Sequence, residues 1–171
     1  MGRQSGWAGA ASPHGPSPSE GRSGKTKRGQ QFAALPWRRS PSGIEILLIS
    51  SRDSGRWIVP KGWPMEGRSG AETAATEAFE EAGIAGTIDS EPIGSFDYLK
   101  TARKGEGRWC SVTVYPMLVE KQLADWPERE QRRLLWLPAE EAAAMADDAG
   151  LAELIRVLTK RLQEAGISSG D

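Results

Sequence analysis

Short apolar runs separated by clusters of Gly, Pro and Ser dominate the middle of the chain. Residues 44–49 give the clearest case, because five of the six are apolar and turn-forming residues flank them at 41–43 and 50–55. Such a run is typical of a strand that is buried on both faces. The same reasoning predicts further strands over 32–37, 57–60, 87–98, 109–119 and 133–137.

Helical signals follow the third predicted strand and return near the end of the chain. Ser69 and Glu72 have capping-box spacing, and Gly83 can adopt the left-handed conformation that ends a helix. An alanine-rich stretch from Pro138 predicts a second helix. Residues 151–166 predict a third, amphipathic helix, with one apolar face formed by Leu151, Leu154, Ile155, Leu158 and Leu162. Strands on both sides of the first helix predict an α/β sandwich with a mixed sheet.

The pattern changes over residues 1–29, where seven Gly, five Ser and three Pro occupy just over half of the positions. This composition predicts a disordered tail over 1–29 and one folded domain over 30–171. The tail holds five basic residues and one acid, which leaves 17 basic and 22 acidic residues in the domain, a net charge of −5. This balance argues against a broad nucleic-acid surface on the folded part.

Two residue counts exclude whole classes of chemistry. Cys110 is the single cysteine, so a disulfide within the chain and a Cys-based zinc site are excluded. His14 is the single histidine and lies in the predicted tail, which removes a Ser-His-Asp triad and a His-rich metal site. No apolar run reaches the roughly 20 residues that span a bilayer, and the N-terminus lacks the apolar core of a signal peptide. We therefore expect a cytoplasmic protein without a membrane partner.

Three carboxylates gather on one side of the first predicted helix. Glu77, Glu80 and Glu81 are related by i,i+3 and i,i+4 spacing and fall within about 100° on a helical wheel. The opposite, packed side is expected to carry Ala71, Ala75, Ala78, Phe79 and Ala82. Solvated glutamates are common on outer helix faces, and the spacing by itself favours that interpretation.

Two observations favour a functional site instead. Like charges at i,i+4 destabilise a helix by a few tenths of a kcal/mol, and no neighbouring cation on this helix relieves them. A strand that ends in Lys61 and Gly62 leads through a short loop into the helix, which brings a backbone carbonyl near the carboxylates. Hard oxygen ligands on a rigid element are what Mg²⁺ or Mn²⁺ requires.

The segment from Gly62 to Ile84 resembles the Nudix box, Gly-x5-Glu-x7-Arg-Glu-U-x-Glu-Glu-x-Gly-U, in which U is aliphatic. The matching positions are Gly62, Glu77, Glu80, Glu81, Gly83 and Ile84. Arg68 stands where the first Glu belongs, and Thr76 stands where the Arg belongs. We interpret the two departures as the loss of a structural ion pair while the metal ligands are retained. Whether Glu66 takes over part of the missing Glu's role stays open.

The resemblance implies a Nudix-type α/β/α sandwich with a mixed β-sheet and a hydrolase that cleaves a phosphoanhydride bond by attack of water on phosphorus. It also implies a Mg²⁺ or Mn²⁺ cofactor, which neutralises phosphate oxygens and lowers the pKa of bound water. Glu77, Glu81 and the main-chain carbonyl of Lys61 are the implied metal ligands. Glu80 is implied as a second-metal ligand or a proton acceptor, and the sequence does not separate these roles.

Further segments are similar to the diphosphoinositol polyphosphate phosphohydrolases, in which a Ser-Ser-Arg segment contacts substrate phosphates. They lie at 50–52, 56–60, 123–126 and 132–139. The similarity implies that Ser51 and Arg52 bind substrate, since a guanidinium holds two phosphate oxygens in a fork. The Lys61 side chain is a weaker candidate for a substrate contact than the Lys61 carbonyl is for a metal ligand. The expected partner is a small-molecule phosphoanhydride; its identity, the oligomeric state and a role for Trp63 stay open.

Two other interpretations compete with a hydrolase. A Nudix-fold module that binds a nucleotide or polyphosphate without turnover would explain the departures at Arg68 and Thr76. The three retained carboxylates argue against it, because a binder of anions gains nothing from clustered negative charge without a metal. An unrelated α/β domain with a solvated glutamate face requires the match in the loop to be coincidental.

Overall fold

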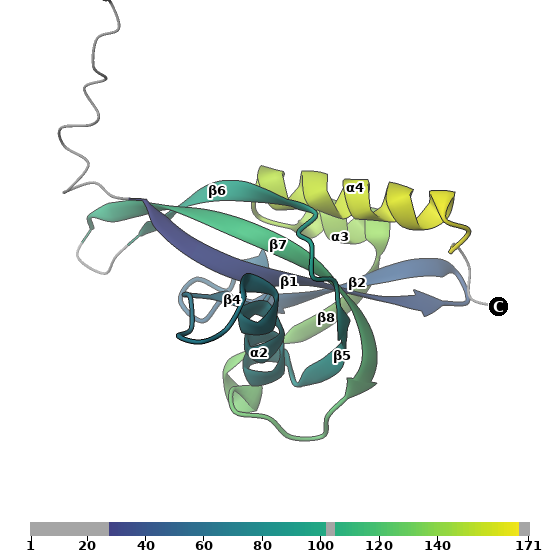
Figure 1. The fold of residues 1–171 in the computed structure, drawn as a ribbon, viewed down its shortest axis with the longest axis horizontal. Helices are drawn as coiled ribbons and strands as arrows, with labels where there is room; N and C mark the ends of the chain where they lie inside the picture. The colour runs from purple at the N-terminus through teal and green to yellow at the C-terminus, as the bar shows by residue number, and fades with distance from the viewer. Residues whose placement is uncertain (1–27, 102–104, 168–171) are drawn as a thin grey trace, which may run out of the picture.

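The computed structural model describes residues 28–101 and 105–167 as a single eight-stranded mixed sheet with helices on both faces (Figure 1). The main strand order is β3-β2-β1-β7-β5, with β4 on β1, β6 on β7 and β8 on β2. The β1–β7 pair is parallel, and the other described pairs are antiparallel. The strands are β1 (Gly29–Ser40), β2 (Gly43–Ser50), β3 (Trp57–Ile58), β4 (Lys61–Gly62), β5 (Ile84–Ile88), β6 (Gly94–Thr101), β7 (Gly107–Gln122) and β8 (Leu134–Pro138).

Helix α2 (Gly70–Ala82) covers one face of the sheet, and α3 (Ala139–Met145) and α4 (Ala149–Glu164) cover the other (Figure 1). Each face has its own apolar core. Alanines of α2 pack against Leu47, Ile49 and Met117 on one side, and α4 packs Leu151 and Ile155 into the other. A short 3₁₀ helix (Arg129–Gln131) precedes β8. The predicted α/β/α sandwich with a mixed sheet is confirmed.

Two of the predicted strands differ in the structure. The expected strand over 87–98 is interrupted, because β5 ends at Ile88 and β6 begins only at Gly94. The four residues 89–92 are Asp, Ser, Glu and Pro, which favour a turn, and the proline lacks the N–H that a central ladder needs. Both strands pair with successive stretches of β7. The expected strand over 57–60 is shorter in the structure, because β3 ends at Ile58. The next strand, β4, begins at Lys61 and pairs with β1, whereas β3 pairs with β2.

The predicted tail falls almost wholly outside the described residues. Strand β1 begins at Gly29, and Arg28 pairs with Asp97 at 2.7 Å. The domain boundary near residue 30 therefore stays a prediction. In the part of the chain that the structure describes, no helix is long and apolar enough to cross a membrane.

Candidate active site

Local sequence signals fix both ends of α2. Ser69 and Glu72 form the predicted capping box, and Gly83 ends the helix with φ 66° and ψ 32°. The segment after β7 holds this end in place, because Trp126 Nε1 donates to the Glu81 carbonyl at 3.2 Å. A Cβ atom at residue 83 would overlap the Trp126 ring, so this position requires glycine for its space as well as for its φ.

The packed face of α2 differs from the helical-wheel prediction. Ala71, Ala74, Ala78 and Ala82 are buried, whereas Phe79, expected on the packed side, is 40% exposed. Glu81 borders the buried alanine stripe and is only 7% exposed. The expectation that all three carboxylates face away from the packed side is therefore wrong for Glu81. The packed stripe is rotated because the sheet and the segment before β8 meet on the Glu81 side of the helix.

Both carboxylate oxygens of Glu81 have protein partners. The Lys61 backbone N–H lies 3.3 Å from Oε1, and Arg132 Nη2 lies 3.2 Å from Oε2. The Glu77 and Glu81 carboxyls lie close enough together for each to affect the pKa of the other. Glu77 packs directly on Gly62, where any Cβ would overlap its carboxylate. The first glycine of the box is thus the cradle of one expected metal ligand.

Arg132 is the functional residue that the sequence reasoning did not find. Its side chain is 6% exposed and pairs with Glu81 and with Glu128, whose Oε1 lies 3.0 Å from Arg132 Nε. Its Nη1 also donates to the Ser50 carbonyl at 3.1 Å. The sequence showed no cation near the carboxylates on the helix itself. The structure places the Arg132 guanidinium beside them from the segment before β8. No local spacing signals a contact between positions 51 residues apart.

Burial dominates the electrostatics of this cluster. It raises the pKa of Glu81 to about 8, with Arg132 acting in the opposite direction and Glu77 adding to the rise. Burial also raises the pKa of Glu77. The same effect lowers the pKa of the Lys61 ammonium to about 8, against the attraction of Glu81. In the absence of a metal ion, the Glu77–Glu81 pair therefore retains a proton near neutral pH.

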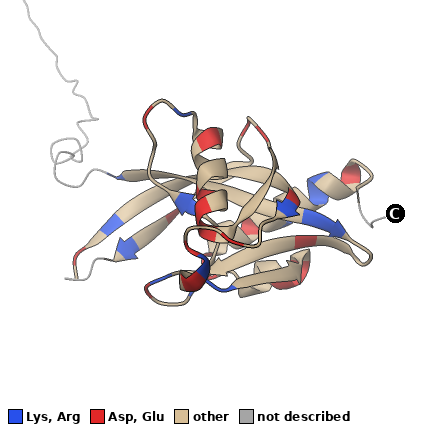
Figure 2. Cartoon of the chain, turned by 90° about the horizontal axis from the view of Figure 1, so that it is seen from below, with Lys and Arg blue, Asp and Glu red and all other residues tan. Residues whose placement is uncertain are grey.

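All six candidate site residues line one cavity of about 360 Å³. The set comprises Ser51, Arg52, Lys61, Glu77, Glu80 and Glu81. An adjoining cavity of about 270 Å³ shares Ser51, Lys61 and Lys100 with the first one and adds Arg56. Both carboxylates and cations line the combined groove. Figure 2 shows acidic positions recurring along the helix that faces the viewer, with basic positions around it.

The substrate-binding candidates differ in how they are held. Ser51 Oγ accepts a hydrogen bond from the Arg56 N–H at 3.0 Å, which closes the loop after β2. Arg52 is exposed and donates from Nη1 to Gln131 Oε1 at 3.1 Å. Trp63 lines the cavity, is 40% exposed and has the Arg108 guanidinium 5.3 Å from its ring centre. Arg103 and Lys104, which precede Arg108 in the sequence, lie outside the described residues.

The donor atoms around Glu77 and Glu81 decide whether the site fits a divalent cation. Within residues 28–101 and 105–167, no three Cys, His, Asp or Glu side chains converge closely enough to hold an ion together. Two carboxylates, Glu77 and Glu81, do meet, against the Gly62 cradle and beside the Lys61 main chain. This hard, oxygen-rich donor set fits Mg²⁺ or Mn²⁺ once a main-chain carbonyl or Glu80 joins it.

The two departures from the box contact each other. The Arg68 guanidinium donates to Thr76 Oγ1, and Thr76 in turn donates to the Glu72 carbonyl at 2.9 Å. A charged hydrogen bond therefore links the two positions at which the motif has Glu and Arg. Arg68 lies outside the cavity that holds the carboxylates and lines a shallow surface depression with Glu72 and Thr76.

We expect Arg68→Glu and Thr76→Arg to be coupled. Arg68→Glu alone removes the bond to Thr76 and adds an acid beside the acidic face, whereas both changes together create an opposite-charge pair. Contacting residues show interaction free energies of roughly 0.5–3 kcal/mol. A double-mutant cycle on the free energy of unfolding and on turnover measures the coupling. Additive effects would show that the observed contact carries no energy.

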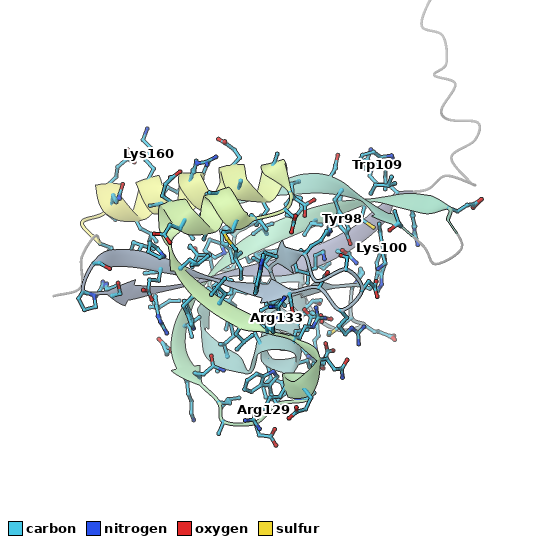
Figure 3. The ribbon with its side chains drawn as sticks, turned by 180° about the vertical axis from the view of Figure 1, so that it is seen from behind. Tyr98, Lys100, Trp109, Arg129, Arg133 and Lys160 are labelled. Carbon is cyan, nitrogen blue, oxygen red and sulfur yellow. The ribbon has the colours of Figure 1, made fainter. Side chains whose placement is uncertain are left out.

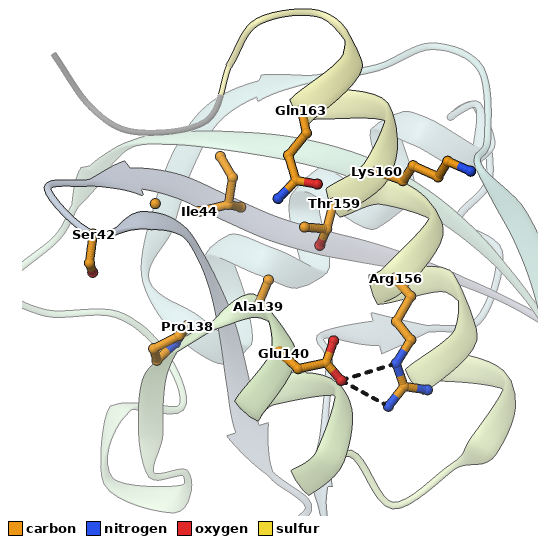
Figure 4. A pocket seen from close by; sticks show the side chains of 10 residues that line it. Ser42, Ile44, Pro138, Ala139, Glu140, Arg156, Thr159, Lys160 and Gln163 are labelled. Atoms are coloured by element: carbon orange, nitrogen blue, oxygen red, sulfur yellow. Dashed lines mark hydrogen bonds and ion pairs between the residues drawn. The ribbon is translucent and has the colours of Figure 1, made fainter.

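A larger cavity, of about 690 Å³, lies away from this site between the β1–β2 turn, α3 and α4 (Figure 4). Arg156 pairs with Glu140 at its edge, with Nη2 3.3 Å from Oε2. None of the six candidate site residues lines it. Cavity size therefore does not identify the active site in this fold, whereas the clustered carboxylates do.

Comparison with known proteins gives a consistent assignment. A family model described as the NUDIX domain matches residues 28–158. Nudix hydrolase 17, mitochondrial, from Arabidopsis thaliana is 35% identical over 143 residues, which cover 79% of this chain and 76% of the relative. Nudix hydrolase 18, mitochondrial, from the same plant is 32% identical over 143 residues, covering 79% and 78%.

A relative from the subfamily singled out in the sequence also matches, over a shorter stretch. Diphosphoinositol polyphosphate phosphohydrolase 3-beta from Bos taurus is 36% identical over 109 residues, which cover 61% of each chain. Among solved structures, the E. coli dihydroneopterin triphosphate pyrophosphohydrolase has a TM-score of 0.61 at 16% identity, covering 79% of this chain and 97% of that one. This likeness concerns the fold. The chain belongs to the Nudix hydrolase family, whose members are enzymes that act on phosphoanhydride bonds.

Proposed function

We propose that the protein is a divalent-metal-dependent hydrolase of a nucleoside-diphosphate-linked or diphosphoinositol-polyphosphate-type substrate. The observation that carries this proposal is the groove in which Glu77, Glu80 and Glu81 face Ser51, Arg52 and Lys61. Negative charge gathered in a groove for an anionic substrate is productive only with a cation between them. The similarity to diphosphoinositol polyphosphate phosphohydrolase 3-beta supports the second substrate class.

The chain's own residues take distinct parts. Glu77 and Glu81 hold the metal, with the Lys61 main chain beside Glu81. Arg132 fixes the Glu81 carboxylate through Oε2 at 3.2 Å and keeps it oriented toward Glu77. Glu80 borders the same cavity as a second-metal ligand or proton acceptor. The cation, when bound, neutralises phosphate oxygens and increases the acidity of water.

Ser51 and Arg52 bind the phosphoryl groups from the loop after β2. Arg52 is tethered to Gln131 by a neutral hydrogen bond, which a phosphate can replace with a stronger charged one. The half-buried Lys61 lines both cavities, and its ammonium group adds positive charge near the carboxylates. The groove thus has a place for the metal and a place for the anionic substrate.

A substrate panel tests the proposal directly. Diphosphoinositol polyphosphates, dinucleoside polyphosphates, ADP-ribose and nucleoside triphosphates are incubated with Mg²⁺ or Mn²⁺, and the released phosphate and products are followed. We expect metal-dependent turnover of at least one substrate, with none in the presence of a chelator. Tight binding without turnover of any substrate would favour the alternative, a Nudix-fold binding module.

The pH dependence of metal-free stability follows from Glu81. Its pKa rises from an ordinary value of 4.5 to about 8 in the folded protein. A group whose pKa is raised on folding contributes stability that is complete below its unfolded pKa and lost as the pH rises through the folded one. We therefore expect the melting temperature in a chelator to fall as the pH rises from about 5 to 8. Lys61, with its lowered pKa, acts in the opposite sense above this window.

Thermal melts of the wild type and of Glu81→Gln measure this effect. The variant cannot ionise, so its melting temperature should depend less on pH over the same range. Mg²⁺ should also reduce the dependence, because a cation stabilises the ionised pair. An equal dependence of melting temperature on pH in the wild type and the variant would contradict the attribution of this effect to Glu81.

The cytoplasmic location stays a prediction. Both plant relatives named above are described as mitochondrial.

A further inference from the structure

A buried amide borders the catalytic groove and has no part in the function proposed above. Gln31 lies on β1 and is 4% exposed, yet it lines the same cavity as Lys61 and the carboxylates. Its neighbour in the wall of that cavity is Tyr98 of β6, which is 7% exposed. Buried side-chain amides in proteins satisfy both their oxygen and their nitrogen, so each half of this amide needs a partner.

The oxygen of the Gln31 amide has a hydrogen-bond partner among the described residues, and the nitrogen has none there. The Tyr98 hydroxyl donates to Gln31 Oε1 at 2.9 Å, which sets the orientation of the amide. Among residues 28–101 and 105–167, Gln31 Nε2 donates no hydrogen bond to another protein atom. In the same residues the single fully enclosed side-chain polar atom without a partner is Thr73 Oγ1. Because Gln31 Nε2 is not one of these enclosed atoms and Gln31 lines the groove, its N–H groups are available to a ligand that binds there.

Two lysines, Lys61 and Lys100, line the groove together with Gln31 and Tyr98. The Lys61 ammonium group lies 4.8 Å above the centre of the Tyr98 ring. Lys100 lies two residues beyond Tyr98 on β6 and therefore on the same face, while Trp109 pairs with Leu99 on the other face (Figure 3). Donors and cations therefore outnumber acids around this amide, where Asp53 is the lining carboxylate that belongs to both cavities. An anionic oxygen that accepts several hydrogen bonds fits this part of the groove.

We propose that Gln31 is a specificity-determining residue whose Nε2 donates to an anionic oxygen of a phosphoryl group beyond the scissile phosphoanhydride. Tyr98 is a positioning residue that acts through the amide oxygen. The inference rests on the proposed function and narrows its substrate class to molecules with at least one phosphoryl group that does not react. Both dinucleoside polyphosphates and diphosphoinositol polyphosphates carry such a group, whereas ADP-ribose does not.

The first test replaces Gln31 by Met, which keeps the length of the side chain and removes its donors. We expect KM for diadenosine tetraphosphate or for a diphosphoinositol polyphosphate to rise about tenfold with little change in kcat, the loss of one hydrogen bond to a charged oxygen. KM for ADP-ribose should not change. The substrate class with the raised KM identifies the source of the phosphoryl group. Gln30→Met, at the exposed neighbouring position on the other face of β1, is the control and should leave KM unchanged.

Two further variants separate recognition from folding. Gln31→Glu keeps the shape but replaces the donor by a carboxylate, so it should raise KM more than Gln31→Met does. Tyr98→Phe frees the amide to rotate and should raise KM for the same substrates by a smaller factor. A KM that is equal to the wild-type value in Gln31→Met and Gln31→Glu, with melting temperatures preserved, overturns the proposal. Turnover of ADP-ribose alone by the wild type overturns it as well.

Equilibrium binding separates this proposal from the activity on which it rests. If the wild type hydrolyses no substrate in the panel, the proposed function fails, and calorimetry with inorganic tripolyphosphate and Mg²⁺ still measures the subsite. Weaker binding by about tenfold in Gln31→Met than in the wild type supports the subsite without catalysis. Equal affinity in the two proteins rejects it.

Discussion

Replacing Glu77 or Glu81 by Gln is expected to lower turnover at least about 100-fold at saturating Mg²⁺, the scale of losing a metal ligand or an essential proton-transfer group. Gln keeps the length of each side chain and removes its charge. In Glu77→Gln the amide still fits against Gly62, so the fold should persist. In Glu81→Gln the amide oxygen can still accept from the Lys61 N–H. The measurement is kcat as a function of Mg²⁺ concentration, together with a thermal melt.

Glu153→Gln provides the matched control, because Glu153 is exposed on α4 on the other face of the sheet. Its kcat should equal that of the wild type. Direct metal binding by calorimetry gives a second measurement that does not depend on turnover, and both site variants should bind Mg²⁺ more weakly. Near-wild-type turnover in both variants would remove these carboxylates from the active site.

Loss of Arg132 is expected to have the largest effect on stability. Arg132→Met leaves the buried Glu81 without its cation and the Ser50 carbonyl without its donor. Above about pH 8, where Glu81 is ionised in the wild type, removing one partner of a buried ion pair costs up to roughly 3–5 kcal/mol, because the remaining charge stays in the low-dielectric interior. Near pH 7 the Glu81 carboxyl keeps its proton, and the loss is smaller. Denaturant unfolding in a chelator measures the loss. It should increase above about pH 8, where Glu81 ionises.

Arg129→Met is the control for this prediction, since Arg129 is exposed and lies three residues away. Its free energy of unfolding should stay within about 0.5 kcal/mol of the wild-type value. Combining Arg132→Met with Glu81→Gln should restore part of the lost stability, because the buried charge is then absent. A double variant as unstable as the sum of the two single variants would show that the pair contributes no coupling energy. Arg132→Met should also lower turnover, since the Glu81 carboxylate loses the group that orients it.

Local sequence patterns determined the helix that carries the chemistry. Ser69, Glu72 and Gly83 act on backbone groups within one turn of their own positions, so a capping box and a left-handed glycine are readable without a structure. The box spacing likewise assigned Glu77 and Glu81 to one site, since residues at i,i+4 on a helix are neighbours wherever the helix packs. The family resemblance supplied the strand arrangement and the expected metal.

Only the tertiary structure decided which side of that helix is buried and what lies against it. A helical wheel places Phe79 on the packed side because the residue is apolar. The orientation of α2 depends on the sheet, however, and in the structure Glu81 is buried while Phe79 is exposed. Arg132 and Gln31 reach the groove from other strands and segments, and no periodicity links positions so far apart in the chain. Long-range packing brings these side chains together, and desolvation then shifts the pKa of Glu81 and of Lys61. The sequence thus determined which residues are expected to hold a metal, while the packing of α2 against β4 and the segment before β8 decided the burial of Glu81 and the neighbours that orient it.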